Sequence, residues 1–320
     1  MILKYLIGIG GGLASAVLFY SASRGSVWLS LILLILSPLP SLIAGFGWGW
    51  QAAAAGGIAG SLIMAIAVSG KFGVGYFLAL GVPSAIAAYL VYLGREAKDA
   101  SHVDWYPAGH MLAAIGYMGA ALPIAVLPLF GGTYAILEPA MADFATKVFA
   151  RASAEFATRA LEPTALKELT ARMVDLLPAA LAGYWSILFT ANVYLAGRVT
   201  RAAGLLPRPW PDLHTLELPS SASALLLAGI AGMLVGGTAR IVGASVCGGM
   251  LVVLAFSGLS VIHCLARHRA QWALWPLYIS MPTPIGLYTL CAAAGLGLAE
   301  PLLQLRRRFG GTPPPVKTPD

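Results

Sequence analysis

Acidic residues are missing from the first 94 positions of this chain, where the charged side chains are Lys4, Arg24 and Lys71. Over all 320 residues, charged side chains make up 10%, against about 25% in soluble globular domains. So little charge cannot supply the polar surface that a soluble globule needs. A soluble globular protein is therefore excluded.

Sequence motifs for several chemistries are absent as well. The five histidines form no HExxH arrangement and have no paired acid, and the chain contains no GxxxxGK[ST] phosphate loop. We therefore expect no metal site, no cofactor, no intrinsic ATPase and no enzymatic activity. Cys247, Cys264 and Cys291 fall inside or beside apolar runs, which predicts packing roles rather than disulfides.

Charge within the apolar runs is scarce too. The thirteen Asp and Glu residues lie outside these runs or at their edges, as Asp175 and Glu300 do. Ion-driven carriers commonly place ionisable groups within the membrane, so independent ion-coupled transport is disfavoured. The formal net charge is +7, but the basic residues form neither a stripe nor an aromatic-interleaved patch. We therefore expect no nucleic-acid partner.

What the chain does contain is long apolar runs. A helix needs about 20 mainly apolar residues to cross a hydrocarbon core of about 30 Å, and its backbone groups must be paired internally. Such runs cover residues 2–22, 27–46, 51–70, 72–93, 110–130, 176–197, 222–239, 242–265 and 272–299. The predicted fold is an all-α polytopic transmembrane helix bundle of about eight or nine spans, surrounded by the lipid bilayer.

The distribution of basic residues predicts the orientation. A cytoplasmic N-terminus in a bacterial inner membrane satisfies the positive-inside rule best. It leaves Arg24, Lys71 and Arg240 outside and places these residues inside: Arg95, Lys98, Arg198, Arg201, Arg208, Arg267 and Arg269. The end of the chain stays open. A single ninth span would put the basic residues 306–308 outside, whereas a fold back near residues 282–284 gives eight spans, a re-entrant hairpin and a tail inside.

Four segments are expected along the chain. Residues 1–199 form a six-helix transmembrane bundle, which includes an amphipathic pair of surface helices at 137–174 between spans five and six. Apolar residues at three- and four-residue steps predict the first helix of the pair, and Pro163 with Thr164 predicts the start of the second. Residues 200–221 form a basic, proline-rich connector, 222–300 hold the C-terminal transmembrane helices, and 301–320 are a disordered tail.

Small residues recur on the first span. Gly8, Gly12 and Ala16 lie four apart on one face, and Gly10 and Ala14 share the same spacing. Small residues at this spacing allow two helix backbones to approach closely, which favours association in lipid. The face serves either packing inside the bundle or docking to another membrane protein.

Prolines predict helix breaks at Pro38, Pro40, Pro83, Pro282 and Pro284, because proline removes a backbone donor and disfavours helix at the preceding residue. Broken helices in membranes are tolerated mainly where they are buried or line a cavity.

Four polar or aromatic side chains of the first six spans are the predicted solute-binding set: Trp48, Trp50, Tyr76 and Asn192. The two tryptophans fit the membrane interface equally well. Asn192 fits an interhelical hydrogen bond better than a ligand contact.

The order of several short segments resembles the bacterial domain-of-unknown-function family 2232, also called YybS-like. The resemblance extends along nearly the whole chain. Besides the glycine-rich first span, it is carried by Ser37-Pro38-Leu39-Pro40 with Gly47-Trp48-Gly49, Asp104-Trp105-Tyr106-Pro107, Pro209-Trp210-Pro211-Asp212-Leu213, and the segments 258–263 and 297–308.

That family is distantly similar to the substrate-binding membrane components of energy-coupling-factor transporters. The resemblance implies a helix bundle whose first helix docks a transmembrane coupling subunit, which separate ATPases serve. The matching positions here are Gly8, Gly12 and Ala16, together with Gly10 and Ala14. This chain differs in having further spans after Gly197, and no ligand-binding residue carries over.

Two functions are compatible with these patterns. The first is a transport-related protein that binds a small, mostly apolar solute within the bundle. The second is a non-catalytic membrane scaffold or assembly factor, in which the small-residue faces bind other membrane proteins. A ligand-sized cavity favours the first function, and tight packing throughout favours the second.

Overall fold

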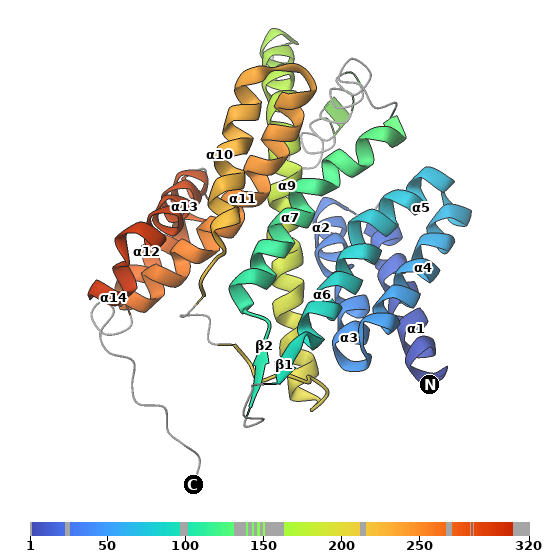
Figure 1. Cartoon of the computed structure of the whole chain (residues 1–320). Helices are drawn as coiled ribbons and strands as arrows, with labels where there is room; N and C mark the ends of the chain where they lie inside the picture. Colours follow the sequence, from blue (N-terminus) through green and yellow to red (C-terminus); the bar gives the residue numbers. More distant parts are fainter. Residues whose placement is uncertain are drawn as a thin grey trace.

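The computed structural model (Figure 1) describes residues 2–22, 26–96, 102–130, 163–211, 216–266, 271–281, 283 and 285–309, with isolated positions between 139 and 150. These residues form a helical bundle, with one short hairpin that pairs β1 (Gly94–Glu96) antiparallel to β2 (Val103–Trp105). The predicted all-α polytopic fold is confirmed.

The helices follow the apolar runs of the sequence. Their bounds are α1 Ile2–Ala22, α2 Val27–Leu36, α3 Leu39–Trp48, α4 Trp50–Ala67, α5 Gly70–Tyr76, α6 Val82–Tyr92, α7 Ala108–Val126, α9 Pro163–Ala202, α10 Ser220–Val235, α11 Gly237–Ala266, α12 Leu274–Ser280, α13 Gly286–Leu303 and α14 Leu305–Phe309. A π-helical turn, Phe77–Gly81, joins α5 to α6, and 3-10 turns occupy Leu127–Phe130 and Gln271–Ala273.

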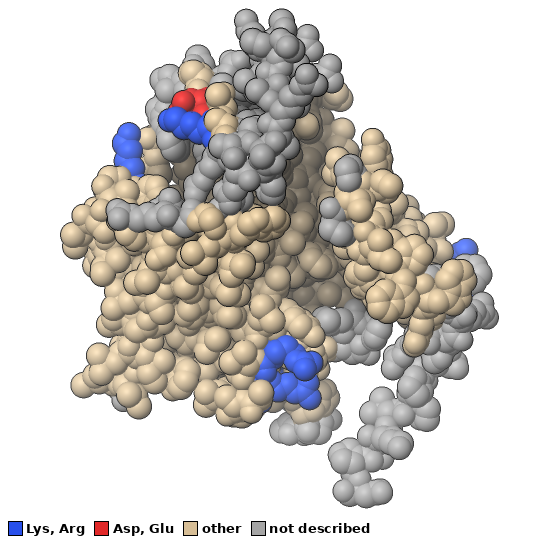
Figure 2. Space-filling view, turned by 180° about the vertical axis from the view of Figure 1, so that it is seen from behind, with Lys and Arg blue, Asp and Glu red and all other residues tan. Residues whose placement is uncertain are grey.

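Eight helical segments among the described residues are long and apolar enough to cross a membrane. They are α1, α2 with α3, α4, α5 with α6, α7, the part of α9 from Leu176, α11 and α13, whereas α10 is shorter at 16 residues. Figure 2 shows no blue or red across the middle of the larger, left-hand part of the molecule. No described Lys, Arg, Asp or Glu side chain therefore lies on that part of the visible surface. Such a band suits contact with lipid.

The N-terminal helices pack through close backbone contacts. α1 lies against α3 and α4, and α4 also contacts α5 and α6. A Cβ on Gly8 would collide with the backbone of Ala52, and one on Gly12 would collide with the backbone of Gly56. Because glycine lacks this atom, α1 and α4 approach more closely than larger side chains would permit.

Proline interrupts the second span at its middle. α2 ends at Leu36 and α3 begins at Leu39, with Pro40 in the first turn of α3. Pro38 has no N–H to offer the carbonyl of Leu34, and the hydroxyl of Ser37 donates to that oxygen instead at 2.8 Å. Pro83 lies in the first turn of α6, directly after the π-helical turn, so the fourth span continues through it.

The helix α11 connects the two predicted groups of spans. It packs against α10 and α13 on one side and against α7 and α9 on the other. The helices of residues 222–300 are therefore joined to those of residues 1–199 through α7 and α9, which lie at the centre of Figure 1.

The helix α13 runs beside the second half of α11. Gly258 there contacts Ala293, and Gly297 contacts Leu254. Arg306 of α14 donates to the backbone oxygen of Leu216 in the connector, at 2.9 Å. The end of α13 therefore lies near the connector that joins α9 to α10. The predicted breaks at Pro282 and Pro284 lie outside the described residues.

Two local predictions are modified. The second amphipathic helix begins at Pro163, as predicted, but it has no end near residue 174, because α9 is one helix of 40 residues from Pro163 to Ala202. No glycine or proline interrupts residues 164–177, so nothing in the local sequence ends the helix before the sixth span. The first amphipathic helix falls mainly outside the described residues. Residues 301–309, assigned above to a disordered tail, are helical apart from Gln304.

Candidate functional site: a half-open pocket beside α9

The predicted solute-binding residues lie in separate places. Tyr76 is buried with Ala16, Met64 and Leu80 between α1, α4 and the π-helical turn. Its hydroxyl donates to the backbone oxygen of Gly12 at 3.3 Å. This tyrosine therefore ties α5 to α1 within the packed interior.

The two tryptophans occupy the junction between α3 and α4. Trp50 is 42% exposed, and its ring meets that of Tyr89 edge-on with 6.4 Å between the ring centroids. Trp48 is half-buried at the last position of α3. Exposed aromatic rings at span ends suit the membrane–water interface.

Asn192 is fully buried on α9, where its amide nitrogen donates to the backbone oxygens of Ile35 at 2.6 Å and Leu188 at 2.8 Å. Its side-chain oxygen has no hydrogen-bond partner. Asn192 thus joins α9 to α2 beside the break at Pro38. The structure has a pocket between α7, α9 and α11, and none of Trp48, Trp50, Tyr76 and Asn192 lines it.

The two small-residue faces of α1 have different surroundings. Gly8, Gly12 and Ala16 are buried against neighbouring helices. Gly10 and Ala14 are exposed, and a Cβ on Gly10 would meet nothing within 4 Å. The first face is therefore used inside the bundle, and the second face points away from it.

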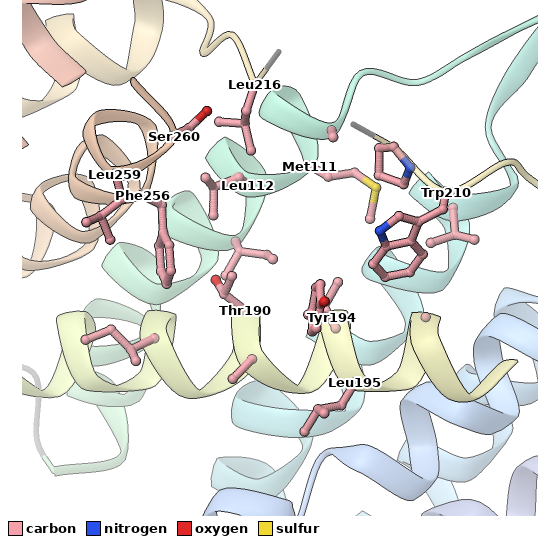
Figure 3. A pocket seen from close by; sticks show the side chains of 18 of the residues that line it. Met111, Leu112, Thr190, Tyr194, Leu195, Trp210, Leu216, Phe256, Leu259 and Ser260 are labelled. Carbon is pink, nitrogen blue, oxygen red and sulfur yellow. The ribbon is translucent and has the colours of Figure 1, made fainter. Parts of the chain in front are cut away.

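A pocket of about 730 Å³ lies where α7, α9, α11 and the connector meet. Figure 3 shows Met111 and Leu112 of α7, together with Thr190 and Tyr194 of α9, on its walls. The other labelled residues of the lining are Leu195 of α9, Phe256, Leu259 and Ser260 of α11, and Trp210 and Leu216 of the connector. The pocket is half-open, so a ligand has access to it without unfolding of the bundle.

The walls of the pocket are mainly apolar. Tyr194 and Trp210 form an edge-on aromatic pair with ring centroids 5.3 Å apart, which gives the pocket an aromatic side. Thr190 also lines the pocket, and its hydroxyl is buried without a hydrogen-bond partner. An unpaired buried hydroxyl costs free energy.

One end of the pocket carries a cation. Arg208 of the connector donates to the backbone oxygen of Tyr106 at 2.9 Å and contacts the sulfur of Met111 at 3.6 Å. Its Nε atom is buried without a hydrogen-bond partner. Burial lowers the pKa of Arg208 from its usual value, yet an arginine remains protonated in proteins. The charge is therefore present at neutral pH.

The other end is formed by α11 and α12. The Nδ1 atom of His263 lies 2.7 Å from the backbone oxygen of Leu259, and its Nε2 atom lies 2.6 Å from the hydroxyl of Tyr278. Because a carbonyl oxygen can only accept, Nδ1 carries the proton, and in the neutral ring Nε2 accepts from Tyr278. These bonds hold α12 against the end of α11.

Sequence reasoning missed this pocket, although it singled out the connector. The available signal was Arg208 close to Trp210 in a proline-rich segment between two spans. Among the described residues, no group of three or more His, Cys, Asp or Glu side chains is placed to hold a metal ion. The pocket instead offers apolar surface, one cation and a few hydroxyl groups.

Comparisons of the chain with protein-family models, with curated proteins and with solved structures find no match.

Proposed function

We propose that this protein is a transport-related membrane protein that binds a small, mainly apolar solute in the pocket between α7, α9, α11 and the connector. The pocket itself is the observation that carries the proposal. Ligand sites commonly measure about 300–1,000 Å³ and combine apolar walls with a few polar groups. A volume of about 730 Å³ with Thr190 and Arg208 on its lining fits that description.

The position of the pocket suits exchange of the solute at one membrane surface. Its lining comes from the first half of α7, the second halves of α9 and α11, and the connector. These segments belong to the side of the bundle predicted to face the cytoplasm. In this proposal the protein resides in the bacterial inner membrane with its N-terminus in the cytoplasm.

The energy for transport would come from a partner, because the chain has no ATP-binding phosphate loop. The resemblance to family 2232 suggests a transmembrane coupling subunit in that role. The exposed Gly10 and Ala14 face of α1 is available for such a contact, whereas the Gly8, Gly12 and Ala16 face is already occupied.

The test is the identification of small molecules that co-purify from native membranes. An Ala191→Phe variant adds bulk at a pocket-lining position, and Val199→Phe adds the same ring at an exposed position of α9 outside the lining. We expect mass spectrometry to find a solute in the wild type and in Val199→Phe, with at least roughly tenfold less in Ala191→Phe. Equal amounts in both variants, or no solute in the wild type, would contradict the proposal.

A membrane scaffold is the second candidate, and the exposed face of α1 is the observation that favours it. Leu3, Leu6 and Val17 are 67%, 59% and 60% exposed, and Gly10 and Ala14 lie between them on the helix. Another membrane helix can approach closely over such small residues. This function requires no solute, so co-purified membrane proteins in the absence of any bound small molecule would support it.

A further inference from the structure

We propose that the solute is an anionic amphiphile, with an acidic group held by Arg208 and an apolar chain lying between α9 and α11. This inference rests on the proposed binding function and specifies the chemical class of the ligand. Its basis is the placement of one arginine, which makes no ion pair with a described carboxylate, at one end of a mainly apolar pocket.

The charge of Arg208 favours an anionic ligand group. Arg208 makes no ion pair with a described carboxylate, and no Asp or Glu is among the residues that line the pocket. A half-buried cation without a counter-ion is unfavourable, because burial removes part of its hydration. A carboxylate or phosphate group would supply the missing charge and would accept charge-assisted hydrogen bonds from the guanidinium.

The position of Arg208 also suits an acidic group of a ligand. The guanidinium is fixed beside the pocket wall by its bonds to Tyr106 and Met111, and Met111 is on the wall in Figure 3. The ring of Trp105 lies on another side of the guanidinium, with 6.0 Å between the arginine Cζ atom and the ring centroid. These contacts leave the buried Nε atom without a partner. The cation is therefore held in place before a ligand arrives.

The rest of the pocket suits an apolar chain. Away from Arg208 the lining is built from side chains such as Leu112, Ile115, Ile187 and Phe256. Burial of apolar surface is favourable, so a hydrocarbon chain would gain stability here where a compact hydrophilic anion would not. Free inorganic phosphate matches the charge of Arg208 but not these walls.

The experiment uses the whole 320-residue chain in a neutral detergent and native mass spectrometry. Three probes share one alkyl chain: hexadecanoic acid, hexadecyl phosphate and hexadecanol. Inorganic phosphate is the fourth probe. We expect both charged amphiphiles to bind the wild type with a Kd at least roughly tenfold lower than that of hexadecanol, as one charge-assisted hydrogen bond implies. We expect no measurable binding of inorganic phosphate.

Three variants complete the test. In Arg208→Gln, the charged amphiphiles and hexadecanol should bind with about the same Kd. Arg208→Lys should retain part of the preference for the charged amphiphiles, because the charge remains. Arg201→Gln removes the same charge from an exposed position near the end of α9 and should keep the full preference. Size-exclusion chromatography and circular dichroism check that each variant is folded.

The outcomes separate the two proposals. Binding of hexadecanol as tight as that of the acids, or an unchanged preference in Arg208→Gln, would overturn the anionic assignment and leave the binding function in place. Binding of inorganic phosphate as tight as that of hexadecyl phosphate would overturn the amphiphile and leave an anion site. No binding of any probe by the wild type, together with no co-purified solute, would overturn both proposals.

Discussion

The side-chain amide of Asn192 on α9 donates a hydrogen bond of 2.6 Å to the backbone oxygen of Ile35 on α2. The two residues are 157 positions apart in the chain. Pro38 and Pro40 interrupt the backbone hydrogen bonds of the second span at this point. A buried polar side chain on one helix thus satisfies a backbone group beside the break in another.

Removal of this amide should destabilise the bundle. Asn192→Leu keeps a similar volume but leaves the Ile35 oxygen without this donor. We expect a loss of about 0.6–2 kcal/mol in the free energy of unfolding, because interhelical hydrogen bonds in membranes are worth about that much. Thermal unfolding of the purified protein measures it, with the exposed Val199→Leu as control. An unchanged midpoint for Asn192→Leu would show that water or another group pairs the carbonyl.

A larger side chain should have different effects on the two small-residue faces of α1. Gly12→Leu places a side chain into the backbone of Gly56 on α4, and overpacking of this kind costs about 1–3 kcal/mol or more. Gly10→Leu meets open space. We expect Gly12→Leu to lower the yield of monodisperse protein and Gly10→Leu to leave it unchanged.

Gly10→Leu also tests the docking role of the exposed face. If a partner binds there, the variant should fold normally but lose that partner in affinity purification from native membranes. Retention of every co-purifying protein in folded Gly10→Leu would rule out docking through this face.

A buried pair of serines should couple α1 to α3. The hydroxyl of Ser41 lies 2.9 Å from that of Ser15, which also accepts from the backbone nitrogen of Ser41 at 3.1 Å. A double-mutant cycle of Ser15→Ala and Ser41→Ala should give a coupling energy of about 0.6 kcal/mol, as is usual for such bonds in membrane proteins. Additive effects of the two substitutions on unfolding would mean that this hydroxyl pair contributes nothing.

The helical structure of α14, which follows α13, should depend on the carboxylate of Glu300. Its carboxylate accepts from the backbone nitrogens of Leu305 and Arg306 at 3.0 and 3.3 Å and lies 3.6 Å from the Arg306 guanidinium. Glu300→Gln removes the charge but keeps an acceptor, so we expect faster amide exchange over 305–309 with little change in α11. Glu300→Ala should have a larger effect. Equal protection in all three proteins would show that the carboxylate does not hold α14.

The contact of Arg306 with Leu216 predicts the side of the membrane on which α14 lies. Because Leu216 lies in the connector between α9 and α10, α14 should be on the same side of the membrane as that connector. Reporter fusions at Gly204 and at the C-terminus should give the same signal, and a fusion at Lys71 should give the opposite one. Opposite signals at Gly204 and the C-terminus would indicate a ninth crossing through α13.

Much of the fold could be predicted from the sequence, because length and apolar character decide whether a helix can cross a bilayer. The first helix was predicted over 2–22 and is found at Ile2–Ala22. The helix start predicted at Pro163 is confirmed, and α9 continues from there into the sixth span without a boundary near residue 174. In that segment the change from polar to apolar residues marked where the predicted membrane begins, not where a helix ends.

The site was harder to predict than the spans. The spacing of Gly8, Gly12 and Ala16 indicated a close helix contact, but only the structure identifies α4 as the neighbour of Gly8 and Gly12. In lipid, outward-facing and inward-facing helix surfaces are both apolar, so periodicity does not distinguish a lipid-facing residue from a packed one. Tyr76 was therefore placed among solute-binding residues, whereas it joins two helices. Asn192 was placed in the same set, but the interhelical hydrogen bond that the sequence favoured for it is confirmed.

The sequence by itself determined that this is a helical membrane protein with few charges and without acids in its first 94 residues, because the hydrocarbon core admits little else. The tertiary structure alone decided which faces meet and where a space remains. The pocket joins Met111, Thr190, Arg208 and Phe256, which come from four separate segments of the chain. Their proximity follows from the packing of α7, α9 and α11, which no local pattern specifies.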